Sequence, residues 1–253
     1  MNLPAILRRR LSIALLGAAL LSVAACGADP TPTPTPAPTA TPTPELTWED
    51  LASSAGGKLT AMTSAKFSMI DENESGALFF NMEFKGMEAE IGSSPDSVRM
   101  LVNAVAPLGF VTIEMIAVGQ EAYMKFSADA PWAPLPIDQV PFNFYGLGDT
   151  MGALVSNIDN GAIARRETVD GAQTIRVDGD LRSDDLSGLI TSSSLGHSLT
   201  VVLWLNESDH TLRQLRITGR IFDDDAPETQ RLIGLGDYNV PVDIQLPDTA
   251  AGS

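Results

Sequence analysis

A stripe of apolar residues at helical spacing opens the folded part of the chain. It consists of Leu51, Ala55, Leu59 and Met62. Thr47 stands before the stripe and Asp50 follows three residues later, which is a variant of the capping box that begins a helix. Gly56 and Gly57 weaken the middle of this helix. We therefore expect a helix that begins after Thr47 and carries one apolar face.

Segments rich in β-branched and aromatic residues, separated by turn residues, make up most of the chain after this helix. The expected strands are 67–71, 77–85, 87–92, 97–103, 109–118, 121–126, 162–168, 173–179, 199–206, 211–222 and 241–246. Their connections carry glycine, proline or acidic residues, as in 93–96 and 170–171. Because these connections are short, we expect neighbouring strands to run antiparallel.

Two segments break the strand pattern. Residues 144–158 carry apolar residues at helical spacing, and residues 183–192 do so after the acidic pair Asp184 and Asp185, which favours a helix start. The order of helix, strands, helices and strands predicts one α+β domain built on an antiparallel sheet.

Two of the expected strands are apolar on both faces. In 109–118, one parity is Val111, Ile113, Met115 and Ala117, and the other still holds Phe110, Ile116 and Val118. In 77–85, one parity is Leu78, Phe80, Met82 and Phe84, and the other includes Phe79. An antiparallel sheet with one face in water alternates more cleanly, so part of the second face also needs cover. Either the helices fill this space as an ordinary core, which composition alone favours, or they leave an apolar cavity.

A cavity of this kind would lie between the sheet and the helices near 147–158 and 184–192. Its expected sheet wall is Phe80, Met82, Val111, Ile113 and Met115. Its expected helix wall is Met151, Leu154, Val155, Leu186 and Leu189. The sequence leaves open which strand parity is concave. Methionine adapts to varied apolar ligands, but it also fills ordinary core gaps.

The chain is strongly acidic. Its formal net charge is −16, and without the three arginines of residues 8–10 it is −19. This charge argues against binding nucleic acid and against lying flat on anionic lipid headgroups. With a single cysteine, Cys26, the chain forms no internal disulfide and no thiolate metal site, so the fold depends on its apolar core.

The N-terminus has the pattern of a secretory signal. Three arginines precede an apolar stretch over 11–25, which is short for a bilayer span, and Cys26 follows directly. The segment resembles a bacterial lipobox, with Val23, Ala24 and Ala25 in its small-residue positions. That resemblance implies a diacylglyceryl thioether on the Cys26 sulfur. The alternative is an ordinary signal peptide or membrane anchor with a cysteine there by chance.

A proline-rich segment separates Cys26 from the domain. Residues 29–44 read DPTPTPTPAPTATPTP, which favours polyproline II and spans about 50 Å at about 3.1 Å per residue. The alternative is a disordered linker of no preferred length. We therefore expect a lipoprotein signal peptide over 1–25, an acylated cysteine and tether over 26–46, and a folded domain over 47–253. The expected location is the extracytoplasmic face of the cell membrane.

No pattern of catalytic or metal-binding residues stands out. His197 and His210 have no cysteine partner, and neither HExxH nor GxSxG occurs. The run Asp223–Asp225 lacks the glycine and the distal glutamate of a calcium loop, so we interpret it as a solvated acidic turn. We expect no enzyme activity, no cofactor and no metal.

Several short motifs, in a fixed order, resemble one known family. They are Thr63–Phe67, Tyr123–Lys125 followed by Trp132, Glu167–Gly171, Thr174–Gly179, Leu199–Leu205 and Asp237–Val242. Together with the lipobox, they make residues 47–247 similar to the LppX/LprA/LprF/LprG lipoproteins, best known from mycobacteria. The long Pro/Thr tether and the heavy acidity depart from that family and leave the ligand open.

The resemblance implies a strongly curved antiparallel sheet with helices on its concave side, as in LolA/LolB carriers. It also implies a cavity that takes the acyl chains of lipids or glycolipids. We therefore expect an anchored lipoprotein that carries or presents lipids at the cell envelope, with a membrane lipid exporter as a further partner. The alternatives are a non-catalytic surface sensor or protein-interaction module with a filled core and, third, a surface hydrolase.

Overall fold

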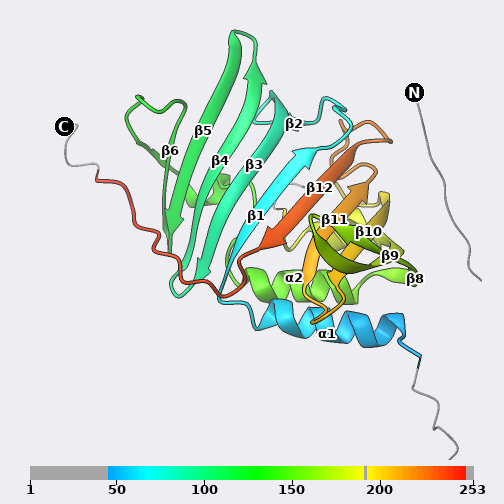
Figure 1. The fold of residues 1–253 in the computed structure, drawn as a ribbon. Coiled ribbons are helices and arrows are strands. Elements are labelled where there is room, and N and C mark those ends of the chain that lie inside the picture. The colour runs from blue at the N-terminus through cyan, green and yellow to red at the C-terminus, as the bar shows by residue number, and fades with distance from the viewer. Residues whose placement is uncertain (1–44, 191–192, 249–253) are drawn as a thin grey trace, which may run out of the picture. The chain divides into compact units, whose positions relative to one another are not determined.

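An open, curved antiparallel sheet and two α-helices form the domain (Figure 1). The computed structural model describes residues 45–190 and 193–248. The predicted α+β class is confirmed. Cys26, the expected signal peptide and the tether as far as Pro44 lie outside the described residues. Neither α-helix of the described ranges is long and apolar enough to cross a membrane.

The helices and strands have the following bounds. The helices are α1 (Trp48–Thr60) and α2 (Leu147–Ser156), with short 3-10 helices η1 (Ile137–Gln139) and η2 (Ser183–Leu186). The first strands are β1 (Ser64–Asp71), β2 (Leu78–Phe79), β3 (Met82–Ser93), β4 (Asp96–Ala106), β5 (Gly109–Val118), β6 (Glu121–Lys125) and β7 (Ala133–Leu135). The later strands are β8 (Asp159–Val169), β9 (Ala172–Arg182), β10 (Ser198–Asn206), β11 (Leu212–Thr218) and β12 (Gln230–Gly236).

Strand β1 joins two meanders into one sheet. The strand order is β7-β6-β5-β4-β3-β1-β12-β11-β10-β9-β8, with β2 paired to β3. One meander runs from β3 to β7 and the other from β8 to β12. Between them, β1 pairs antiparallel with β3 on one side and with β12 on the other. The first strand of the domain, β1, is therefore hydrogen-bonded to the last, β12.

Helix α1 begins where the sequence predicts. The Thr47 hydroxyl accepts a hydrogen bond from the Asp50 N–H at 3.2 Å, and the Asp50 carboxylate accepts one from the Thr47 N–H at 3.3 Å. This reciprocal pair satisfies donors that a helix start otherwise leaves free. The apolar stripe is buried, since Leu51, Ala55 and Leu59 are all 0% exposed.

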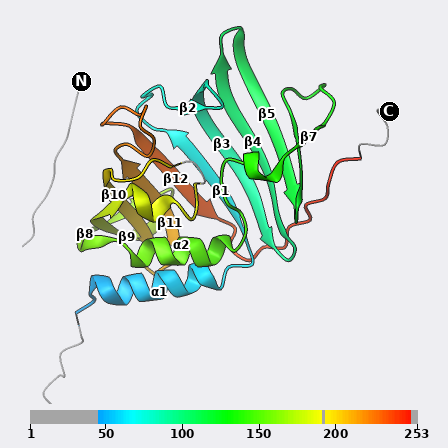
Figure 2. The same cartoon turned by 180° about the vertical axis from the view of Figure 1, so that it is seen from behind.

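Glycines let α2 lie directly against α1. A Cβ added at Gly148 would lie 2.4 Å from the Leu59 carbonyl oxygen, and one added at Gly152 would lie 2.6 Å from the Thr60 Oγ1. Any side chain at these two positions would push the helices apart. The two helices run side by side in both views (Figures 1 and 2).

The expected single strand over 77–85 is wrong. The chain turns at Phe80 and Asn81, which both adopt left-handed backbone with φ of 48° and 59°. Strand β2 then pairs back on β3, with Phe79 opposite Met82. Phe80 and Met82 therefore do not share one strand face. No glycine or proline marks this turn in the sequence.

Three further predicted elements differ from the structure. The expected strand over 241–246 is irregular, and the final strand is β12. The strand expected over 211–222 ends at Thr218, before the left-handed Gly219. In the described part of 183–192, only the short η2 is helical.

Candidate functional site: the apolar interior

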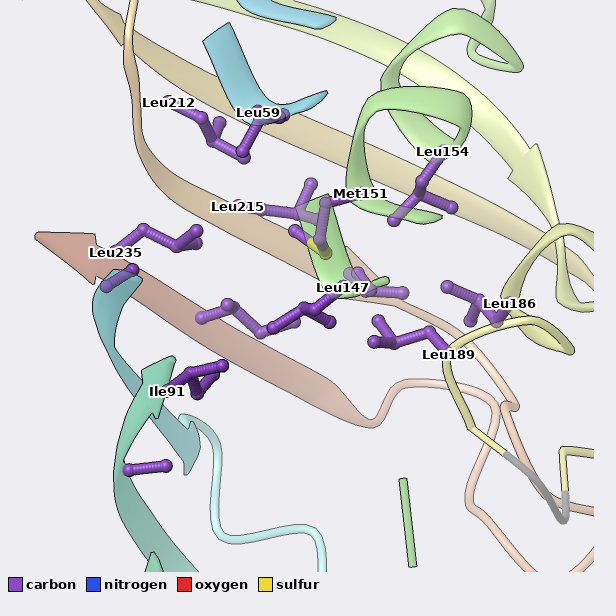
Figure 3. Close-up of a cluster of buried hydrophobic side chains, with 14 of the residues drawn as sticks. Leu59, Ile91, Leu147, Met151, Leu154, Leu186, Leu189, Leu212, Leu215 and Leu235 are labelled. Atoms are coloured by element: carbon purple, nitrogen blue, oxygen red, sulfur yellow. The ribbon is translucent and has the colours of Figure 1, made fainter. Parts of the chain in front are cut away.

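The sheet and the helices enclose one continuous apolar cluster. Figure 3 shows side chains from different elements converging in it. Leu59 of α1 lies near Leu212 of β11, and Met151 of α2 lies near Leu215 of the same strand. Leu235 of β12 and Ile91 of β3 extend the cluster across the sheet. The interior thus combines residues from both meanders and both helices.

The more apolar parity of β5 faces this interior. Ile113 and Met115 are 0% and 2% exposed, whereas Phe110 on the other parity is 65% exposed. Their cross-strand partners on β4, Val102 and Met100, are also fully buried. The alternation assigns one face of β4 and β5 to the apolar cluster, while the opposite face carries exposed Phe110 but also Ile116, which is 4% exposed.

Most of the residues predicted for the cavity wall lie in this cluster. The buried members are Ile113, Met115, Met151, Leu154, Val155, Leu186 and Leu189. Met82 is half-buried and packs against the cluster. Val111 is half-buried near the open end of β5, and Phe80 lies in the β2–β3 turn, where its side chain is 43% exposed. The structure therefore does not bring Phe80 together with the helix residues.

The connection between β7 and α2 contributes residues that the sequence did not single out. Val140 and Phe144 are buried members of the cluster, as is Leu135 at the end of β7. From behind, this connection with η1 is seen to pass over the face of β3 and β4 (Figure 2). It has neither helical nor strand periodicity, so its only signal is the aromatic content of residues 142–145.

Long-range hydrogen bonds hold this connection in place. The Asn143 N–H donates to the Leu189 carbonyl at 2.8 Å, and the Tyr145 hydroxyl donates to the Gly119 carbonyl. Burial raises the pKa of the Tyr145 hydroxyl above its usual value. The Phe144 and Tyr145 rings stack with centroids 4.4 Å apart.

A hollow of about 240 Å³ adjoins one end of the apolar interior. It lies where the end of α1, the β3–β4 hairpin and the start of α2 meet. Met62, Ile91, Phe144 and Leu147 give it apolar walls. This volume is below the range of about 300–1,000 Å³ that is usual for small-molecule sites.

A larger groove of about 820 Å³ lies on the opposite, polar face of the sheet. Its lining includes Lys66 of β1, Glu88 and Glu90 of β3, and Arg99 of β4. These residues alternate with buried apolar neighbours and so point away from the interior. The groove is larger, but its charged walls do not suit an acyl chain. The smaller hollow has apolar walls at Met62, Ile91, Phe144 and Leu147, while Asp96 and Asp149 lie among its polar lining.

Asp225 corrects the interpretation of 223–225 as a solvated turn. Its side chain is 2% exposed and forms a two-point ion pair with Arg231, with N–O distances of 2.6 and 2.9 Å. The same carboxylate accepts backbone N–H bonds from Ile221 and Phe222 at 2.9 and 3.0 Å. This pair fixes the loop between β11 and β12.

The two histidines are half-buried and have separate partners. His197 Nε2 lies 2.8 Å from the Asp223 carboxylate, and His210 Nδ1 lies 3.2 Å from the Ser54 hydroxyl. In the described residues, no group of three or more His, Cys, Asp or Glu side chains could hold a metal ion. The non-enzymatic assignment remains an expectation.

Trp204 organises a charged cluster on the outer face. Its indole N–H donates to Glu167 at 2.6 Å, and the Arg216 guanidinium lies 5.0 Å from its ring centroid. The bond from Trp204, followed by one from Arg165, lowers the pKa of Glu167. Arg216 is in turn paired with Glu72. These contacts tie β8 and β10 to the start of the β1–β2 connection.

A protein-family model described as LppX_LprAFG lipoprotein matches residues 49–244. No curated protein sequence matches this chain. The domain is similar to the crystal structure of LprF from Mycobacterium bovis, with 18% identity and a TM-score of 0.63. That match covers 79% of this chain and 96% of LprF.

The crystal structure of the lipoprotein LppX from Mycobacterium tuberculosis is also similar. It has 14% identity and a TM-score of 0.52, over 77% of this chain and 97% of LppX. At these identities the similarity establishes the fold. The sheet order and the paired helices described above are therefore a known arrangement.

Proposed function

Because the chain belongs to the LppX_LprAFG lipoprotein family, we propose that it is an anchored extracytoplasmic lipid-binding protein. Cys26 carries the acyl anchor, and the domain binds lipids or glycolipids by their acyl chains. The helices occupy the concave side of the sheet, and the ligand lies between them and the sheet. The protein carries or presents lipid at the envelope, and an envelope lipid exporter is its partner in transfer.

The placement of the methionines is the observation that carries this proposal. Every methionine of the described residues belongs to the apolar cluster or packs against it. The buried ones are Met62, Met87, Met100, Met115 and Met151, and the half-buried ones are Met69, Met82 and Met124. Unbranched thioether side chains repack at low cost, so an interior rich in them can adapt to an inserted chain.

The energy available from such an interior is sufficient. Each buried methylene contributes about 0.8 kcal/mol, so ten methylenes contribute about 8 kcal/mol. That is the scale of micromolar affinity before the cost of ordering the ligand. The hollow beside Phe144 and Leu147 is the proposed point of entry, because it connects solvent with apolar walls.

Entry requires the hollow to enlarge. The helices are locked to each other by the close approach at Gly148 and Gly152, so they move as a pair. The connection containing Phe144 is held to the rest of the domain chiefly by a few hydrogen bonds and by its buried side chains. We infer that this connection and the start of α2 move away from β3 when a lipid enters.

Native mass spectrometry of the purified protein tests the proposal. We expect co-purified lipid in the parent protein. In Val155→Trp, we expect less bound lipid with little change in stability, because the added ring occupies ligand space. Val177→Trp is the matched control, since Val177 of β9 is equally buried but lies outside the expected wall.

Two outcomes contradict parts of this proposal. A filled core would instead make Val155→Trp lose about 1–3 kcal/mol of stability, as expected for the control. Unchanged lipid content together with that loss would remove Val155 from the wall. Absence of any lipid in the parent would reject the carrier function and favour a surface sensor or interaction module.

A further inference from the structure

Two apolar turns project together at one end of the sheet. Leu108, in the β4–β5 turn, is fully exposed, and Phe110 beside it is 65% exposed. Leu78 of β2 and Phe80 of the β2–β3 turn are 46% and 43% exposed. We call these four side chains the apolar rim. They are large residues that would normally be buried.

The strand register places both turns at the same end. Leu78 is opposite Glu83, Glu83 is opposite Val105, and Val105 is opposite Phe110. At about 4.8 Å per strand, Leu78 and Phe110 lie about 14 Å apart across one row. The β4–β5 hairpin reaches past its neighbours, away from α1 and α2, in both views (Figures 1 and 2).

The rim is free of net charge in a strongly acidic chain. Residues 100–113 and 77–82 contain no acidic or basic residue, while the whole chain has a net charge of −16. Two of the flanking acidic residues have basic partners. Glu83 is paired with Lys85, and Glu114 with Lys125. The four rim side chains carry no charge themselves, so their own transfer into an apolar phase requires no desolvation of an ionised group.

We propose that the apolar rim inserts into the surface of the bilayer to which the chain is anchored. This inference rests on the proposed lipid-binding function, because the ligand must leave a membrane. Apolar side chains that project from two neighbouring turns suit insertion into a fluid apolar phase. A protein partner would instead need a surface of complementary shape. The rim makes the contact with the bilayer, and the acyl anchor at Cys26 keeps the domain close to that bilayer.

The tether brings the rim to the membrane at high effective concentration. The sequence between Cys26 and Glu45 is long enough to span about 50 Å, so the domain remains beside its own bilayer. Linking converts docking into an intramolecular step, and a weak insertion then suffices. Such reversible contact fits a carrier that must also leave the bilayer.

Fluorescence quenching by brominated lipid tests the contact directly. The full acylated protein is reconstituted in phosphatidylcholine vesicles with or without bromine on the acyl chains. For Leu108→Trp, we expect quenching beyond that of the parent, whose own tryptophans give the background. Val240→Trp is the control, since Val240 is 51% exposed and lies beside Ser64, at the opposite end of the strands.

The double variant Leu108→Ser/Phe110→Ser supplies a second measurement. Burying one such side chain shifts an equilibrium by about tenfold or more. We therefore expect at least a tenfold slower transfer of fluorescent phosphatidylcholine between the protein and vesicles, with unchanged co-purified lipid.

Equal quenching of Leu108→Trp and Val240→Trp would overturn the proposal, and would point to a protein partner for the rim. An unchanged transfer rate in the double variant would overturn it as well. Loss of co-purified lipid from the parent would count against the lipid-binding function instead, so the two failures are distinguishable.

Discussion

Removing Arg231 should destabilise the domain by about 3–5 kcal/mol, because it leaves the Asp225 carboxylate buried without its cation. Asp225 and Arg231 are 5% and 4% exposed, and two hydrogen bonds of 2.6 and 2.9 Å join them. A domain of this size typically has about 5–15 kcal/mol of stability, so Arg231→Met should retain a fraction of it. Urea unfolding followed by tryptophan fluorescence measures the loss.

The double variant Arg231→Met/Asp225→Asn separates charge burial from lost packing. The asparagine oxygen can still accept the N–H groups of Ile221 and Phe222, which Asp225 now binds. No ion is then buried, and the loss should be at least about 1 kcal/mol smaller than in Arg231→Met. A cost below about 1 kcal/mol for Arg231→Met would refute the reasoning, because the carboxylate would then be reaching water.

Three other predictions concern the anchor, the tether and an exposed cluster. Cys26→Ser should abolish acylation and either release the protein or leave an uncleaved precursor; normal processing with continued membrane extraction by detergent would contradict the lipobox. Deletion of residues 1–45 should leave a cooperative thermal transition, and its loss would show that the deleted segment is needed for folding. Trp204→Phe should raise the pKa of Glu167, as measured by carboxyl NMR, because the indole N–H lowers it. A carboxyl group whose pKa is lower in the folded state stabilises the fold above its unfolded-state pKa, and this stability is lost as the pH falls through the folded-state pKa. Below about pH 4.5 the parent should therefore lose stability more steeply than Trp204→Phe. Parallel profiles of stability against pH would contradict this.

Local patterns in the sequence predicted the features that local interactions determine. The start of α1 depends on Thr47 and Asp50, which are three residues apart, and the sequence located it correctly. The stripe of α2 likewise predicted buried Met151, Leu154 and Val155. The more apolar parity of β5 packs inward, a choice that the sequence left open, and the motif order identified the family.

Features that depend on distant partners could not be predicted. Phe80 adopts a left-handed backbone that its residue type does not favour, because β2 pairs back on β3. Glycines in β12 weakened its strand pattern, and its partners are β1 and β11. Asp225 looked like part of a solvated run because its partner Arg231 lies in the next strand.

The pairing of β1 with β12 constrains how the domain can fold during synthesis. Ile70 is matched with Leu232, so the two strands come from opposite ends of the domain sequence. A chain that emerges N-terminus first exposes one edge of β1 until nearly the whole polypeptide has followed. Unpaired edges invite intermolecular strand pairing, and such long-range closure is slow. Truncation before residue 230 should therefore yield aggregation-prone products, because β1 then keeps an unpaired edge.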